Sequence, residues 1–249
     1  METTEDAFFE RRIRVRQHRE GYRFSIDAVI LAHYAAGFGT FPGNGISMPP
    51  RHILDLGTGC GIIPLIIAFR RPADRITGVE IQDELARLAE ENVQRNGMAD
   101  RITILHKDLK HIRRENLSAP VDLVVSNPPY RRPGSGRLNV QSQRAVARHE
   151  ICVALPDVIR AAARTLDISG RFAAVFPAER LVGLFLEMQT AGIEPKFLRL
   201  VHSRRDTGAK LALVEGMKGA RPGLSVSPAL VIYRENGSYT EAATEMFRG

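Results

Sequence analysis

The sequence predicts an α/β fold, an open sheet of mostly parallel strands with helices on both faces. From residue 51 onward, short apolar runs suited to buried strands alternate with helical patterns. A glycine-rich turn follows the first of these strands, and later strands end in acids or a polar turn, as expected where ligands bind at the carboxyl edge of a parallel sheet. A chain of 249 residues with 44% hydrophobic residues can form one such domain with modest additions.

The turn after the first strand is the centre of the predicted fold. Strand 53–56 and helix 62–70 flank Gly57, Gly59 and Gly61. Alternate glycines let a nucleotide-like ligand approach the backbone at the start of a helix. A dinucleotide fingerprint would need glycine at position 62, and no Gly-Lys-Ser or Gly-Lys-Thr follows, so nicotinamide and triphosphate loops are disfavoured. A tight turn without a ligand is the alternative.

Acids follow the next two strands. Strand 75–79 runs into Glu80, about 20 residues beyond the glycines, where a carboxylate would accept the hydroxyl hydrogens of a ribose. Strand 102–106 is followed by Asp108. Because ligands bind outside the carboxyl ends of parallel strands, we expect Asp55, Glu80 and Asp108 to converge on one crevice.

A fourth strand, 121–125, delivers the sequence Asn127, Pro128, Pro129, Tyr130 to the same edge. A rigid proline turn that only ends the strand is the alternative. Together with DLGTGCG at 55–61, this NPPY sequence resembles the Rossmann-type methyltransferases that use S-adenosylmethionine, in the branch that methylates exocyclic or amide nitrogens. That family has a Rossmann-like seven-stranded sheet, mostly parallel with the last strand antiparallel.

Three further segments narrow the resemblance. GYRFSIDAVILA at 21–32, ARHE at 147–150 and LVEGMKG at 213–219 are similar to the bacterial tRNA adenine-N6 methyltransferases that modify a valine tRNA. The resemblance covers most of the chain and implies S-adenosylmethionine as cofactor and RNA, in particular tRNA, as partner. DNA adenine methyltransferases and release-factor glutamine methyltransferases share the NPPY pattern, so both stay open as alternatives.

The motif positions and the resemblance assign cofactor binding to residues at the carboxyl edge and one N-terminal acid, and no metal is expected. The cofactor-binding residues are Asp27, Asp55, Leu56, Gly57, Thr58, Gly59, Cys60, Gly61, Glu80, Ile81, Asp108, Leu109 and Asn127.

The NPPY residues are the expected catalytic group. An adenine amine is a poor nucleophile because its lone pair is delocalised into the ring. The side-chain oxygen of Asn127 and the carbonyl of Pro128 would each accept one N–H, which directs the lone pair toward the methyl donor. Pro129 completes the rigid turn, and Tyr130 offers a flat face to an extruded base.

A long polar segment follows Tyr130 and is interpreted as a substrate loop whose arginines contact phosphates. We assign substrate binding to Arg131, Arg132, Arg137, Arg148 and His149. A catalytic base at His149 is the alternative to a substrate or structural contact, although an amine attacking a sulfonium becomes acidic only after transfer.

Residues 1–50 are expected to form an N-terminal extension to a methyltransferase domain at 51–249. The alternation from Arg12 to Arg16 predicts a strand with one arginine face, with a turn near Gly21, although a charged edge strand without function would look the same. Helix 25–36 with Ser25 as N-cap and a loop at 37–50 follow. In the resembled family this part forms a lid over the cofactor.

The remaining elements complete the sheet. We expect helices at 83–96, 151–166 and 179–190, strands at 171–176, 197–202 and 210–215, a further candidate strand at 229–233 and a short C-terminal helix. The short connector between the strands 197–202 and 210–215 predicts an antiparallel pair. A second basic surface is expected from Arg204, Arg205, Lys210, Lys218 and Arg221.

The charge and the cysteine content limit which functions the sequence allows. The net charge of +7 favours an acidic partner, and the cysteines Cys60 and Cys152 are too few for a disulfide framework. Without a signal-like or membrane-spanning apolar stretch, we expect a cytoplasmic protein with no membrane partner. The sequence does not decide whether the chain dimerises, and a monomer is favoured. Roughly fifty residues before the glycine loop are too few for the helical recognition domain of release-factor enzymes. A catalytically silent nucleic-acid-binding protein is the non-enzyme alternative, and the intact NPPY sequence argues against it.

Overall fold

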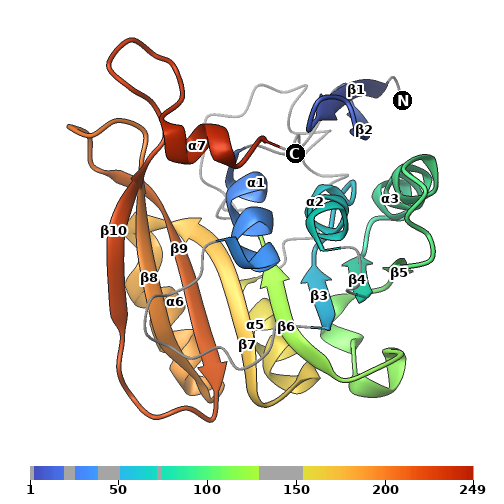
Figure 1. Cartoon of the computed structure of the whole chain (residues 1–249). Helices are drawn as coiled ribbons and strands as arrows, with labels where there is room; N and C mark the ends of the chain where they lie inside the picture. The colour runs from blue at the N-terminus through green and yellow to red at the C-terminus, as the bar shows by residue number, and fades with distance from the viewer. Residues whose placement is uncertain (1–2, 20–25, 39–50, 72–74, 129–153, 249) are drawn as a thin grey trace, which may run out of the picture.

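The computed structural model describes residues 3–19, 26–38, 51–71, 75–128 and 154–248. These residues form an eight-stranded sheet of order β10-β8-β9-β7-β6-β3-β4-β5 and a separate two-stranded hairpin (Figure 1). The strands of the sheet are β3 (His52–Leu56), β4 (Arg75–Glu80), β5 (Ile102–His106), β6 (Val121–Ser126), β7 (Leu166–Pro177), β8 (Ile193–His202), β9 (Ala209–Lys218) and β10 (Ser225–Val231).

The pairing confirms the α/β prediction. β9 is antiparallel to both of its neighbours, and every other neighbouring pair in this sheet is parallel. β9 is the seventh and last strand of the expected sheet, so its direction agrees with the prediction. The candidate strand at 229–233 overlaps the end of β10, which begins earlier, at Ser225, and ends at Val231. β10 pairs with β8 and is an eighth, outermost strand of the sheet.

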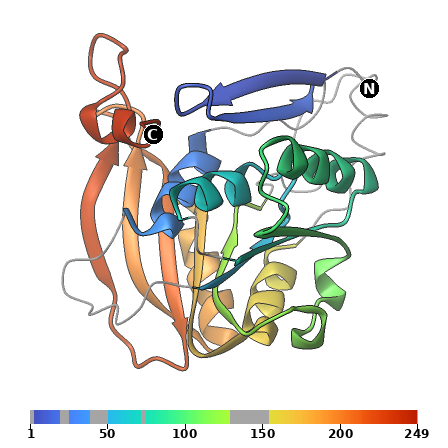
Figure 2. The same ribbon diagram turned by 45° about the vertical axis from the view of Figure 1, so that its right-hand side comes forward.

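Helices cover both faces of the sheet (Figures 1 and 2). One buried cluster packs α1 (Ile26–His33), α2 (Ile62–Arg70), α3 (Asp83–Arg95) and α7 (Glu241–Glu245) on one face. The other cluster packs α5 (Leu155–Thr165) and α6 (Leu181–Thr190) on the opposite face. Short helical turns are the π-helical η1 (Tyr34–Phe38) and the 3-10 turns η2 (Leu109–His111), η3 (Arg114–Asn116) and η4 (Ala178–Arg180).

Several predicted boundaries were wrong. The α-helical part of the predicted helix 25–36 ends at His33, and η1 continues the chain to Phe38, with Gly37 at φ 88°. Leu166, which we placed at the end of a helix, begins β7, a strand twice the predicted length. Short apolar runs do not show how far the sheet ladder continues, because hydrogen bonding to neighbouring strands decides it. Ser25 and residues 151–153 lie outside the described residues.

The N-terminal hairpin consists of β1 (Thr3–Phe8) and β2 (Ile13–His18). The predicted alternation is present, since Ile13 and Val15 are fully buried and Arg14 is exposed. β1 was not predicted, because its acidic residues obscure the alternation typical of a strand. The turn between β1 and β2 has positive φ at Phe9, Glu10 and Arg11. The expected turn near Gly21 lies outside the described residues.

The hairpin lies across α2 and α3 (Figure 2). The Phe9 ring stacks on Phe69 of α2 at 4.8 Å between centroids, and Ile13 and Val15 join the buried cluster of that face. The division into residues 1–50 and 51–249 stays a prediction.

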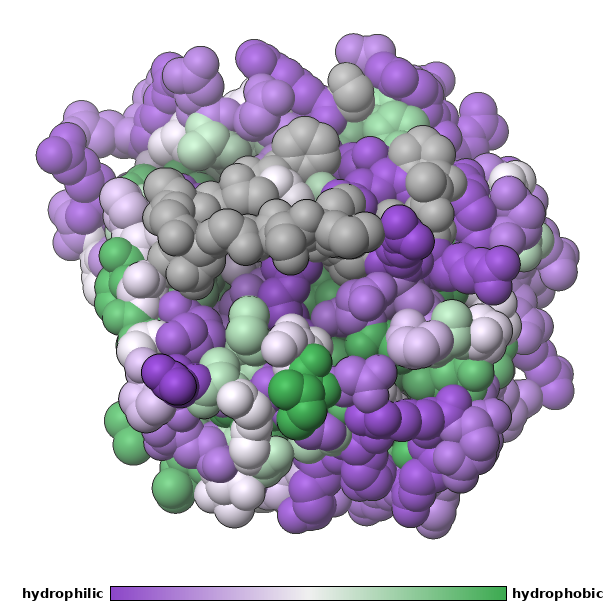
Figure 3. Space-filling view, turned by 60° about the horizontal axis from the view of Figure 1, so that its bottom comes forward, coloured by the Kyte–Doolittle hydropathy of each residue, from purple (hydrophilic) through white to green (hydrophobic). Residues whose placement is uncertain are grey.

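The described helices include none that is both long and apolar enough to cross a bilayer. The lower edge of the molecule, brought forward in Figure 3, is largely hydrophilic, with hydrophobic residues in small separate patches.

Two glycines give a matched test of the packing. A Cβ at Gly216 in β9 would lie 2.8 Å from Ile193 Cγ2 and 2.9 Å from the Glu194 carbonyl oxygen, whereas one at Gly183 in α6 would meet nothing within 4 Å. Gly216→Ala should therefore destabilise the fold by about 1–3 kcal/mol through overpacking. Gly183→Ala should stabilise it by roughly 0.5–1 kcal/mol, because alanine has the higher helix propensity. Denaturant unfolding of both variants measures the two signs, and equal effects would contradict the packing described.

Candidate active site

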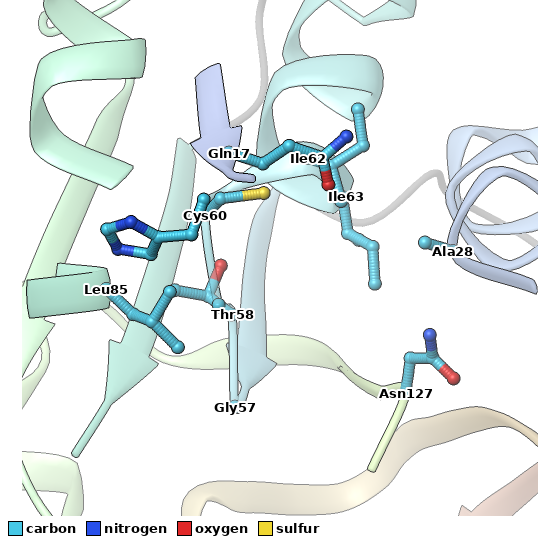
Figure 4. Close-up of a pocket in the computed structure, with 11 residues that line it drawn as sticks. Gln17, Ala28, Gly57, Thr58, Cys60, Ile62, Ile63, Leu85 and Asn127 are labelled. Carbon is cyan, nitrogen blue, oxygen red and sulfur yellow. The ribbon is translucent and has the colours of Figure 1, made fainter. Parts of the chain in front are cut away.

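Parallel pairing brings three strand ends to one edge of the sheet. Asp55 of β3 lies opposite Gly78 of β4 and Val125 of β6, so the turns after these three strands are neighbours. A pocket opens at this edge (Figure 4). It is lined by Gln17, His18, Ala28, Gly57, Thr58, Gly59, Cys60, Ile62, Ile63, Leu85 and Asn127.

The glycine turn forms one wall of the pocket. The N–H groups of Gly57 and Thr58 both donate to the Val79 carbonyl at 2.9 and 3.0 Å, which ties the turn to the end of β4. Gly57 and Gly59 have φ values of 78° and 58°, and a Cβ at either position would have no atom within 4 Å. Glycine is thus needed for the backbone conformation, and the space beside the turn is open to a ligand.

Glu80 holds this turn in place. Its carboxylate accepts N–H bonds from Gly59 at 3.0 Å and from Ile81 and Gln82 at 2.9 Å each, and the residue is 6% exposed. Ionised acceptors make stronger hydrogen bonds than neutral ones, so these contacts orient both the turn and the start of α3.

Asp55 is fully buried, and neither of its carboxylate oxygens has a hydrogen-bond partner among the described residues. Burial raises the pKa of this carboxyl to about 7; the nearby Thr58 hydroxyl opposes the shift, and the Glu80 charge adds to it. An unpartnered buried carboxyl beside a glycine turn is suited to a ligand that brings its own donors.

The end of β6 supplies the first NPPY residues. The Ser126 hydroxyl donates to the Leu56 carbonyl at 2.8 Å and joins the ends of β6 and β3. Asn127 follows directly and lines the pocket, where Figure 4 shows it on the same side as Ala28 and across from Cys60. The remaining catalytic and substrate candidates, Pro129, Tyr130, Arg131, Arg132, Arg137, Arg148 and His149, lie outside the described residues.

The other predicted cofactor residues occupy varied positions. Leu56 and Leu109 are buried, and Asp27 is buried beside the pocket residue Ala28. Gly61 caps the start of α2. Asp108 lies at the same sheet edge, where its side chain accepts from the Lys110 N–H at 2.8 Å. Their roles in cofactor binding, with that of Ile81, stay predictions.

Sequence reasoning missed the pocket residues that come from neighbouring elements. Gln17 and His18 belong to β2, Ile63 to α2 and Leu85 to α3. Both ring nitrogens of His18 are buried without a partner among the described residues. Only the packing of the hairpin on α2 and α3 brings Gln17 and His18 to the pocket that the glycine turn lines.

Two asparagines of α3 fix the hairpin there. Asn96 accepts from the Arg14 N–H at 2.9 Å and donates to the Arg14 carbonyl at 2.7 Å. Asn92 makes the same pair of bonds with Arg16, each at 2.8 Å, and also donates to the Cys60 carbonyl at 2.9 Å. Residues four apart on a helix share a face, and residues two apart on a strand share an edge. The Asn-x-x-x-Asn spacing at 92–96 was the available signal.

Comparisons with known proteins agree with this geometry. The fold is similar to a predicted O-methyltransferase from Agrobacterium tumefaciens, with a TM-score of 0.66, 20% identity, and coverage of 88% of this chain and 94% of the other. Residues 44–186 match the methyltransferase small domain family model. This chain belongs to the methyltransferase small domain family.

Two relatives show more closely which methyltransferases this chain is similar to, and they confirm the resemblance that the motifs indicate. The chain is 35% identical to a Porphyromonas gingivalis protein named tRNA1(Val) (adenine(37)-N6)-methyltransferase, over 80% of this chain and 73% of the relative. A protein of the same name from Mannheimia succiniciproducens is 31% identical over 82% of this chain and 81% of its own length.

The raised pKa of Asp55 predicts a pH-dependent cost in the free protein. Between the ordinary value of 3.8 and about 7, the folded state keeps a proton that the unfolded chain releases, so rising pH favours unfolding. Each pH unit in that window should lower the free energy of unfolding by about 1 kcal/mol. Asp55→Asn removes this group and should gain stability relative to wild type as the pH rises from 5 to 7. Urea unfolding at several pH values tests this; parallel stability curves would contradict it.

Proposed function

We propose that this protein transfers a methyl group from S-adenosylmethionine to the exocyclic N6 amine of an adenine in RNA, specifically in a tRNA. The observation that carries the proposal is the position of Asn127, at the start of the NPPY sequence, facing the glycine turn across one pocket. The relatives named tRNA1(Val) (adenine(37)-N6)-methyltransferase support adenine in tRNA as the target.

The residues at the strand ends fit this cofactor. A carboxylate offers about four acceptor positions, and Glu80 uses three for backbone N–H groups, so it can also accept from a ribose hydroxyl. The unpartnered oxygens of Asp55 can accept from an ammonium or from ordered water, and the bare glycine turn admits close contact. When bound, S-adenosylmethionine supplies an electrophilic methyl group on its sulfonium sulfur.

The chain's own contribution to the reaction is positioning. Two acceptors, the Asn127 side-chain oxygen and the Pro128 carbonyl, receive the two N–H bonds of the adenine amine and make its nitrogen more tetrahedral. Both acceptors stabilise the positive charge that develops on that nitrogen. Tyr130 supports the extruded base by stacking, and the fixed approach contributes a large part of the rate. The proton leaves the product amine to solvent or to a base, for which His149 is the candidate that the sequence offers.

The positive charge of the chain and the names of its relatives favour RNA over DNA or a release factor as the substrate. Phosphate contacts from Arg131, Arg132, Arg137 and Arg148, with His149, would suit a folded RNA. A looped adenine costs least to unstack, which favours a tRNA loop over duplex DNA. Release-factor glutamine and DNA adenine methylation remain the competing activities, and silent nucleic-acid binding the non-catalytic one. Action as a monomer in the cytoplasm, where tRNA is found, is part of this proposal.

Asn127→Ala should lower the rate of methyl transfer by roughly a hundredfold or more, comparable to the loss of an oxyanion-hole donor. Cofactor affinity, measured by calorimetric titration, should change far less. Asn127→Asp keeps an acceptor oxygen of the same reach and should retain more activity than alanine. Near-normal turnover in Asn127→Ala would show that the amine is not held by this side chain.

The substrate is tested by offering several acceptors in parallel. With labelled S-adenosylmethionine, wild-type protein should place label in the tRNA fraction of total RNA that lacks the modification, and digestion should yield N6-methyladenosine. Duplex DNA and release factors should take up little label. Label on protein glutamine would refute RNA as substrate but keep the NPPY chemistry. Absence of label on all substrates would favour a silent binding protein.

A further inference from the structure

The predicted second basic surface is not one surface. Arg204, Arg205 and Lys210 lie at the start of β9, whereas Lys218 and Arg221 lie at its end. β9 has ten residues, so its ends are about 30 Å apart. The prediction grouped these residues because they are close in sequence. The strand β9 separates the two groups and places them at opposite edges of the sheet.

The first of these groups lies at the edge that carries the pocket. β6 and β7 run parallel, β9 is antiparallel to both β7 and β8, and β8 is parallel to β10. The ends of β6, β8 and β10 therefore share one edge of the sheet, as Figure 1 shows. β8 is three strand positions from β6, which is roughly 15 Å across the sheet. β8 also continues four residues past the level of Ser126, to His202, so the loop after β8 begins roughly 20 Å from Asn127.

Hydrogen bonds join the loop after β8 to the loop after β10. The Tyr233 N–H donates to the Ser203 carbonyl at 2.9 Å, next to the bond from the Ile232 N–H to the His202 carbonyl at 3.0 Å. Within the loop after β10, the Arg234 N–H donates to the Ser238 carbonyl at 2.8 Å. Within the first loop, Thr207 Oγ1 accepts from the Arg204 N–H at 3.1 Å and donates to its carbonyl at 2.8 Å. Both loops are thus ordered before any partner binds, which reduces the entropy lost on binding.

The two joined loops expose arginines and stacked aromatic rings. Arg204, Arg205 and Arg234 are exposed and form no ion pair with other described residues, although Asp206 and Glu235 lie in the same loops. The rings of Tyr233 and Tyr239 stack at 5.2 Å, and the two residues are 36% and 40% exposed.

This aromatic pair is backed by a third ring. Tyr239 stacks on Phe247 at 5.3 Å, so Tyr233 ends a three-ring stack. Tyr233 and Tyr239 are also the only aromatic residues among the large hydrophobic side chains that the described part of the chain exposes. Sequence-tolerant RNA binding commonly combines phosphate contacts from arginine with stacking of unpaired bases on aromatic rings.

We propose that the loops at 203–208 and 233–239 form an RNA-binding surface beside the pocket, which we call the C-terminal RNA surface. Arg204 and Arg205 contact phosphates, and Tyr233 stacks on an unpaired base of the RNA whose adenine is methylated. This inference rests on the proposed function, because it takes the same RNA as its ligand.

Matched double variants test the phosphate contacts. In the full chain, Arg204→Ala with Arg205→Ala should weaken binding of an unmodified tRNA transcript roughly tenfold at moderate salt and lower the salt slope of binding by about two. Arg75→Ala with Arg221→Ala removes the same charge from exposed positions at the opposite edge and should leave affinity near wild type. Filter binding over a range of salt concentrations measures both. Equal losses in the two double variants would overturn the proposal and show a nonspecific charge effect.

A tyrosine variant tests the stacking. Tyr233→Ala should weaken transcript binding by roughly tenfold, and Tyr233→Phe, which keeps the ring, should not. Methyl transfer at saturating transcript and the affinity for S-adenosylmethionine should stay near wild type in all of these variants, and thermal melting checks that each is folded. Unchanged transcript binding in the Arg204/Arg205 and Tyr233→Ala variants, with wild type methylating RNA, would refute this surface alone. Failure of wild type to methylate any RNA would refute the proposed function, and this outcome is measured by methyl transfer, independently of transcript binding.

Discussion

Three backbone N–H groups directed at one buried carboxylate fix the arrangement on which the site depends. Glu80 accepts from Gly59 in the turn after β3 and from Ile81 and Gln82 after β4, so one side chain joins two strand ends. The parallel register of β3 and β4 brings these groups within reach, and the Ser126 hydroxyl joins the end of β6 in the same way. The pocket walls are therefore held before a ligand binds, which is the condition for catalysis by positioning.

The asparagine pair of α3 extends this order to the N-terminal hairpin. The free edge of a strand exposes backbone N–H and C=O groups, and a side-chain amide can bond both kinds. Asn92 and Asn96 therefore satisfy the backbone groups of Arg14 and Arg16 on β2 that a third strand would otherwise pair with. Asn92 also binds the Cys60 carbonyl, which couples the hairpin to the glycine turn through one fully buried side chain. Gln17 and His18 line the pocket as a consequence of this docking.

Local patterns were reliable where side chains alone decide the structure. The apolar run of β3, the positive φ required at Gly57 and Gly59, and the acid at the end of β4 are all readable from residue type and spacing. β1 was missed because its pairing with β2, and not its composition, makes it a strand. The boundary at Leu166 failed for a similar reason, since the ladder with β6 extends β7 beyond its apolar core.

By itself the sequence determined the fold class, the edge of the sheet that carries the glycine turn and Asn127, and the kind of chemistry these residues support. Those conclusions depend on motifs in which neighbouring residues act together, and chain order preserves them. Only the tertiary structure decided that His18 lines the same pocket as Gly59, that Asp55 has no partner among the described residues, and that Arg205 and Arg221 lie at opposite edges. Each of these depends on the direction and packing of separate elements. Long-range hydrogen bonds and burial set both, and local spacing alone does not decide them.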